Sequence, residues 1–210
     1  MRISELSRKS GVSVASIKFY LRDGLLPPGV ATATNQAEYD ERHLGRLRLI
    51  RTLRDVGGLD LARIGRVTAA IDDEALAPHA VFGVVQRALA PTSDERAADP
   101  LLAAAHADVD RLLVDLGWEV SADAPSRRPL ANALAALRRS GRPVDASVFR
   151  RYAEAIAPLA EWEVGVVPTG GDPSESVERM AVGTVVFEAA LVALRRLAHE
   201  HFSSVRSRVR

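Results

Sequence analysis

The first 28 residues constrain this chain most, because they combine two short helical segments with a tight turn. A helical segment over residues 3–9 leads to Gly11, and a second helix begins at Ser13, a residue type that caps helix N-termini. Gly24 supplies the left-handed residue that ends this second helix. Two short helices joined in this way predict a helix-turn-helix, whose second helix lies in the major groove of DNA.

The second helix has two chemically different sides when its residues are placed 100° apart. Val14, Ile17 and Leu21 fall on one side and predict the buried stripe. Small residues on the opposite side let the backbone approach base edges, basic residues reach phosphates, and aromatic rings contact thymine methyls or sugars. The residues predicted to contact DNA here are Ser13, Ala15, Ser16, Lys18, Phe19, Tyr20 at the edge, and Arg22. The alternative for the two rings is packing against the following loop.

Residues 27–39 favour a short two-stranded wing over a helix. They contain two prolines, a glycine and the β-tolerant run Ala31-Thr32-Ala33-Thr34. The segment between Arg22 and Arg42 has no basic residue. Contacts between the wing and DNA therefore have to come from Thr32, Thr34, Asn35 or Gln36, of which we predict Thr34 and Asn35.

A basic helix over residues 40–56 follows the wing. Leu47, Ile50, Leu53 and Val56 recur every three residues and predict its buried stripe. The helix carries five arginines, Arg42, Arg46, Arg48, Arg51 and Arg54. We expect one or two of them, Arg42 first, to touch phosphate, and others to pair with nearby carboxylates. The pair Gly57-Gly58 ends this helix, and another runs over residues 60–71.

The order of these elements over residues 1–72 resembles the N-terminus of MerR-family transcription regulators. The matching residues are Ser16, Lys18-Phe19-Tyr20, Gly24-Leu25-Leu26-Pro27, Tyr39 before the basic helix, the glycine turn, and Leu61-x-x-Ile64. The resemblance implies a winged helix-turn-helix that also uses Tyr39, a homodimer on an inverted repeat in a promoter, and an indirect action on RNA polymerase through distorted DNA. It also implies a small-molecule effector bound by the C-terminal region. Two departures are Lys18, where the family mostly has arginine, and the wing, which lacks the usual arginine.

Composition narrows the classes further. Residues 1–66 carry 12 Lys/Arg and 7 Asp/Glu, whereas residues 67–210 carry 16 and 20, so the positive charge is concentrated at the N-terminus. The sequence contains no cysteine, on which metal-sensing and redox-sensing family members rely. Histidine spacing, glycine-rich loops and nucleophile motifs typical of enzymes are also missing, so we predict no metal, no cofactor and no enzyme activity. Without an apolar run of about 18 residues we expect no membrane association and a cytoplasmic protein.

The remaining two-thirds predict several shorter helices. Pro78, Pro91 and Pro100 interrupt residues 75–105, where familiar family members have one long helix that pairs antiparallel with its partner. Helices are expected over residues 99–117, 126–141, 145–163 and 174–202. The predicted fold is therefore mainly α, with a winged helix-turn-helix domain over residues 1–74 and an all-helical effector-binding and dimerisation domain over residues 75–210.

The last predicted helix is apolar on two faces. The stripe Val177, Met180, Thr184, Phe187, Leu191, Leu194, Ala198, His201 alternates at spacings of three and four, and Val182, Val185, Ala189 and Val192 form a second face. A helix with two apolar faces packs against its own domain and a partner at once. We predict a dimer interface that includes Met180, Phe187, Leu191 and Leu194; residues 75–90 are the rival, and a purely intramolecular helix is the alternative.

Aromatic residues near carboxylates predict where an effector binds. Trp118, Phe149, Tyr152 and Trp162 are the candidates, and Glu161 and Glu163 flank the last of them, which suits a cationic aromatic ligand. Two other hypotheses remain open. The C-terminal domain is a module for a protein partner, or the protein is an architectural DNA binder with weak sequence preference and a steep salt dependence.

Overall fold

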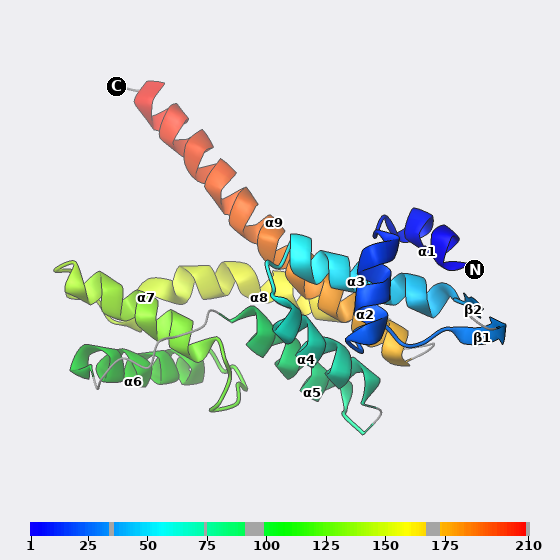
Figure 1. The fold of residues 1–210 in the computed structure, drawn as a ribbon. Coiled ribbons are helices and arrows are strands. Elements are labelled where there is room, and N and C mark those ends of the chain that lie inside the picture. The colour runs from blue at the N-terminus through cyan, green and yellow to red at the C-terminus, as the bar shows by residue number, and fades with distance from the viewer. Residues whose placement is uncertain (34–35, 74, 91–98, 167–172, 209–210) are drawn as a thin grey trace. The chain divides into compact units, whose positions relative to one another are not determined.

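A computed structural model describes residues 1–33, 36–73, 75–90, 99–166 and 173–208. The chain divides into two compact units: unit 1 combines Met1–Ala88 with Val167–Arg210, and unit 2 is Leu89–Val166. The predicted mainly helical fold with an N-terminal helix-turn-helix is confirmed (Figure 1). The proposal that residues 1–74 form a domain of their own stays a prediction.

Helices α1 (Ile3–Ser10) and α2 (Val14–Arg22) form the helix-turn-helix. Gly11 has φ +68°, a left-handed conformation that glycine adopts without strain, and it turns the chain between them. The hydroxyl of Ser13 accepts a hydrogen bond from the backbone N–H of Ser16 at 3.1 Å and so caps α2. Ile17 fixes α2 in the core because its side chain is fully buried.

The predicted wing is present as an antiparallel hairpin of β1 (Val30–Ala33) and β2 (Gln36–Glu38). Val30 pairs with Glu38 and Ala31 with Ala37. Thr34 and Asn35, which we predicted to contact DNA, lie outside the described residues.

Helix α3 (Glu41–Asp55) is buried on more sides than its predicted stripe required. Leu47, Ile50 and Leu53 are buried as expected, but Leu44 and Leu49 are buried too, and Val56 is 48% exposed. Helices α4 (Leu61–Asp72) and α5 (Pro78–Leu89) follow. Asp60 caps α4, because its carboxylate accepts a hydrogen bond from the backbone N–H of Arg63 at 2.8 Å. Because α3 is buried on several faces, a further helix must pack against it, and α9 is that helix.

Helix α9 (Pro173–Arg208) belongs to unit 1 although the whole of unit 2 separates it from α5 in the sequence. It packs along α3 and also contacts α4, as the orange and cyan ribbons in Figure 1 show. Val177, Ala181 and Val185 are its buried apolar residues. A Cβ added at Gly57, in the turn after α3, would lie 2.7 Å from the carbonyl oxygen of Leu53 and 3.2 Å from Val185, so both the turn and α9 leave no room for a side chain there. Residues 188–208 of α9 are exposed throughout.

Unit 2 consists of α6 (Pro100–Asp115), α7 (Arg127–Arg139), the 3-10 helix η1 (Ala146–Phe149) and α8 (Arg150–Gly165). Its core is formed by buried residues of α6, α7 and η1, among them Val109 and Leu134. The single helix predicted over residues 145–163 in fact begins as η1, because the Asp145 carboxylate accepts from the Ser147 N–H at 2.8 Å and tightens the first turn. Within the part of the chain that the structure describes, no helix is both long and apolar enough to cross a membrane.

Candidate nucleic-acid interface

The exposed side of α2 carries most of the residues predicted to contact DNA. Ala15, Lys18 and Arg22 are exposed, and Ser16 and Phe19 are half-buried. The guanidinium carbon of Arg22 lies 5.2 Å from the centre of the Phe19 ring, so the ring supports this cation. The hydroxyls of Ser13 and Ser16 lie 2.9 Å apart at the start of the helix. This side therefore presents small, hydroxylic and cationic groups together, as the sequence predicted.

Tyr20 occupies a different place from the exposed edge where the sequence put it. Its side chain is 4% exposed, and Arg54 of α3 donates a hydrogen bond to its hydroxyl at 3.0 Å. Arg54 also donates to Asp55 at 2.9 Å, and this hydrogen bond holds the pKa of the Asp55 carboxyl below its usual value. Tyr20 therefore links α2 to α3, because its ring fills the space between them and its hydroxyl is bonded.

A basic residue that the sequence did not predict as part of the wing is bonded to it. Arg2, just before α1, donates to the side-chain oxygen of Gln36 in β2 at 2.5 Å. Arg2 precedes Gln36 by 34 residues and lies outside the segment between Arg22 and Arg42 from which wing contacts were expected. The only signal was its position in the basic N-terminal segment. The exposed wing thus carries a guanidinium, together with the exposed apolar side chain of Val30.

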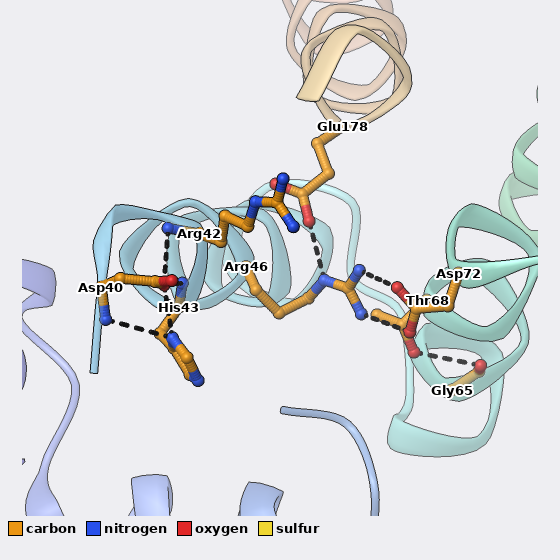
Figure 2. A network of polar contacts seen from close by, with 8 residues as sticks. All are labelled: Asp40, Arg42, His43, Arg46, Gly65, Thr68, Asp72 and Glu178. Atoms are coloured by element: carbon orange, nitrogen blue, oxygen red, sulfur yellow. Dashed lines mark hydrogen bonds and ion pairs between the residues drawn. The ribbon is translucent and has the colours of Figure 1, made fainter. Parts of the chain in front are cut away.

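Tyr39 and Asp40 join the wing to α3. Tyr39 is buried, and its ring meets the His43 ring edge-on with 5.2 Å between their centres. The Asp40 carboxylate caps α3 by accepting from the backbone N–H groups of Arg42 and His43, at 3.1 Å and 3.2 Å (Figure 2). The hydrogen bond with the His43 side chain lowers the pKa of the Asp40 carboxyl against the opposing effect of burial. The join is thus fixed by a cap and a buried ring.

The arginines of α3 have different surroundings. Arg42 and Arg48 are exposed, and Figure 2 shows the Arg42 side chain extended toward Glu178 of α9. Arg51 donates to the carbonyl of Ser10 at 3.5 Å and lies over the turn between α1 and α2. Arg46 is 4% exposed, so it is unavailable to a phosphate. Sequence periodicity cannot separate a solvated arginine from a buried one on the same helix.

The residues predicted for an effector are spread over unit 2. Phe149 packs against the core of the unit, Trp118 follows α6, and Tyr152 and Trp162 lie on α8 with about half of each side chain exposed. A cavity of about 340 Å³ in the same unit is lined by other residues, among them His106, Asp110 and Arg127. In the described ranges, no three or more His, Asp or Glu side chains are grouped as a metal site.

Comparison with known proteins agrees with this architecture. Residues 1–71 match the family described as MerR HTH family regulatory protein. The chain is 42% identical over 57 residues to the HTH-type transcriptional regulator HmrR of Sinorhizobium medicae, and it covers 39% of that protein and 27% of itself in doing so. It is 40% identical over 113 residues to the HTH-type transcriptional regulator MerD of Acinetobacter calcoaceticus, covering 93% of MerD and 50% of this chain. The chain belongs to the MerR family of transcriptional regulators.

A solved structure extends the likeness beyond the N-terminal third. The crystal structure of SCO5550, a proposed transcriptional regulator from Streptomyces coelicolor A3(2), superimposes with a TM-score of 0.79 at 40% identity, over 98% of this chain and 97% of that chain. The likeness therefore includes unit 2 and α9, which the family model for residues 1–71 does not reach.

Proposed function

We propose that this protein is a sequence-specific DNA-binding transcriptional regulator that binds an inverted repeat in a promoter as a homodimer. The observation that carries the proposal is the exposed side of α2, with Ala15, Lys18 and Arg22 exposed on a capped helix at the surface of a MerR-type domain. In the major groove, Lys18 and Arg22 neutralise phosphates, while Ser16 and Ala15 lie close to base edges. Arg2 on the wing supplies a further phosphate contact beside the groove.

Dimerisation through α9 is the second part of the proposal. Met180, Thr184, Phe187, Leu191, Leu194, Ala198, His201 and Val205 alternate at spacings of four and three residues, the heptad pattern of a coiled coil. Residues 191–205 of this seam are exposed, with Leu191 at 37% and Leu194 at 64%. They belong to a different face of α9 from Val185, which is buried and lies against Gly57 just after α3. A second copy of the helix covers such a seam.

The residues beside the seam favour an antiparallel pair. In the register that places Leu191 against the partner's Leu194, bulky Phe187 meets the partner's Ala198, and Glu188 lies beside the partner's Arg195. Each dimer contains this arrangement twice because of its two-fold symmetry. A parallel pair instead sets Phe187 against its own copy and His201 against its own copy, with no opposite charges alongside.

Disulfide trapping tests the register, because the chain has no cysteine of its own. Leu191→Cys and Leu194→Cys variants are mixed and oxidised under mild conditions. The antiparallel register brings the two different sites within disulfide distance, so the mixed dimer forms the bond and each variant alone forms little. Rapid trapping of each variant with itself instead indicates a parallel pair.

The regulatory mechanism follows the family. A dimer that distorts the DNA between promoter elements realigns them for RNA polymerase, and occlusion of the promoter is the repressing outcome of the same binding. A small-molecule effector bound by unit 2 is the proposed control, with Trp118, Tyr152 and Trp162 as its aromatic contacts. A candidate effector that raises the melting temperature of the wild type saturably supports control by a small molecule. The rise is expected to be lost in Trp162→Ala and kept in Glu154→Gln.

Selection of bound sites from random duplex DNA by the full-length protein tests DNA recognition. Recovery of an inverted repeat supports a sequence-specific dimer, and recovery of no motif contradicts it. The Lys18→Ala and Arg22→Ala variants then separate roles: each weakens binding at all sequences and lowers the slope of log affinity against log salt by about one. An unchanged slope for Lys18→Ala contradicts the proposed orientation of α2.

A role for unit 2 in binding a protein partner is the second candidate. Helix α8 has no buried residue, and Leu159 and Val164 on it and Val166 just after it are exposed. Leu159→Asp and Val164→Asp together abolish co-purification with such a partner from the source organism while DNA binding stays unchanged. Loss of DNA binding in this double variant contradicts a separate partner surface.

A further inference from the structure

Arg46 joins three helices through a single buried guanidinium group (Figure 2). Its Nε donates to Glu178 of α9 at 2.7 Å, and its two Nη atoms donate to the two carboxylate oxygens of Asp72 at the end of α4, at 3.0 Å and 2.5 Å. Burial alone lowers the pKa of Arg46, but the hydrogen bonds with Asp72 and Glu178 outweigh it and raise the pKa. The group is charged at every pH of interest.

Glu178 also lies close to the backbone of α3. A Cβ added at Gly45 would lie 3.1 Å from the Glu178 carboxylate, so the carboxylate sits directly over the backbone of α3. Buried Val177 and Ala181 flank Glu178 on α9. A guanidinium is planar and presents its donors in a fixed fork, so it sets an angle between its partners as well as a distance.

Helix α3 supports both the DNA-contacting helix and α9. Tyr20 of α2 is bonded to Arg54 near the C-terminal end of α3, and Glu178 of α9 is bonded to Arg46 nearer its N-terminal end. The angle between α9 and α3 therefore fixes the direction of the coiled-coil seam relative to α2. We name the group formed by Arg46, Asp72 and Glu178 the arginine clasp.

We propose that the arginine clasp sets the half-site spacing that the dimer accepts on DNA, by fixing the angle at which α9 leaves the DNA-binding part. The inference rests on the proposed dimer through α9. At 1.5 Å per residue, the centre of the proposed seam, near Val192, lies about 20 Å along α9 from Glu178. A tilt of about 10° at the clasp then moves each DNA-binding part by about 4 Å, close to one base step of about 3.4 Å.

Glu178→Gln tests the clasp because the amide keeps the size and one hydrogen-bond acceptor but removes the charge. Glu200→Gln is the matched control, an exposed carboxylate further along the same helix. Affinity of each full-length protein is measured on duplexes in which the half-sites selected by the wild type are separated by spacers lengthened or shortened one base pair at a time. The dimer dissociation constant and the melting temperature are measured alongside.

The wild type and Glu200→Gln are expected to share one sharp spacer optimum. Glu178→Gln is expected to remain a dimer. Its optimum is expected to shift by about one base pair, or its affinity for duplexes with neighbouring spacers to lie within about threefold of its best affinity. A merely stabilising contact lowers affinity equally at all spacers, and that result overturns the proposal. If Glu178→Gln does not fold, Asp72→Asn removes the charge of the half-exposed partner of the same fork, and an unchanged spacer profile there is the overturning result.

The outcomes separate this inference from the proposed function. A wild type that selects no paired half-sites contradicts the dimeric DNA-binding proposal itself. A wild type with a sharp optimum that Glu178→Gln reproduces contradicts only the clasp.

Discussion

The two halves of α9 have similar apolar content but opposite surroundings. Residues 177–185 bury Val177, Ala181 and Val185 against α3 and α4 and bond Glu178 to a buried arginine. Beyond residue 187 every side chain of the described helix is exposed, including Leu194, Leu197 and Phe202. One continuous helix is therefore fixed at one end by its own chain, whereas in the proposed dimer a second copy covers its exposed end. In the proposed dimer, α9 would thus carry the position of one DNA-binding part to the other subunit.

The largest expected effect comes from placing charges in the exposed seam. Leu191→Asp with Leu194→Asp is expected to weaken the dimer by at least about 3 kcal/mol, more than 100-fold, because both carboxylates face the partner in an apolar seam. Sedimentation equilibrium measures the dissociation constant. Val192→Asp is the control, since Val192 is exposed on another face, and monomers produced by this control contradict the seam assignment.

The next largest effect is expected from removing Arg46, which holds the buried half of α9 on α3 and α4. Arg46→Met is expected to lower the free energy of unfolding by about 3 kcal/mol or more, because the Glu178 and Asp72 carboxylates lose their shared cation. Urea unfolding at a fixed protein concentration measures the change. Arg48→Met, which alters an exposed arginine of the same helix, changes this energy by less than about 0.5 kcal/mol. Equal effects of the two variants contradict the assignment of Arg46 as a buried structural cation.

Exchanging the charges of Glu188 and Arg195 tests the proposed ion pairs beside the seam. Glu188→Arg places like charges beside the partner's Arg195 and is expected to raise the dimer dissociation constant severalfold, from about 0.5 kcal/mol at each of two symmetric positions. Adding Arg195→Glu in the same chain restores opposite charges and most of the affinity. A double variant that dimerises no better than Glu188→Arg contradicts the antiparallel register.

The smallest effect concerns the glycine beneath Glu178. Alanine is favoured over glycine inside a helix by up to about 1 kcal/mol. Gly83→Ala in α5 is therefore expected to raise the free energy of unfolding, because the atom nearest to the new Cβ is the flexible end of Arg87. Gly45→Ala is expected to lose this gain because the new Cβ crowds the Glu178 carboxylate at 3.1 Å. Thermal unfolding of both variants measures the difference, and an equal gain contradicts close docking of α9 at this point.

Local patterns in the sequence predicted most of the secondary structure. Ser13 caps the helix that it was expected to cap, a helix follows Asp60 close to the predicted residues 60–71, and the Pro/Gly-rich segment after α2 forms a hairpin. These features depend on a few neighbouring residues, whose preferences act within one turn. The exposed cations of α2 were predictable for the same reason. The burial of Tyr20 was not, because its partner Arg54 lies on another helix.

Contacts between distant segments required the tertiary structure. Arg2 on the wing, Arg46 under α9 and the return of α9 to unit 1 each join residues far apart in the chain. A helical wheel finds an apolar face but not the surface that covers it, so the two faces of α9 were visible in the sequence and their neighbours were not. Gly45 and Gly57 were weak indications of the packing of α9, since segments approach closely where a side chain is missing.

The helix-turn-helix, the wing, the Ser13 cap and the alternating apolar pattern of α9 are encoded locally, because each depends on spacing and residue type over a short stretch. Three features emerge only from the folded chain: which arginines are buried, which side of α9 its own chain covers, and that unit 2 is inserted in the sequence between α5 and α9. Those outcomes depend on packing between surfaces distant in the chain, where the apolar area removed from water and the pairing of buried charges select one arrangement.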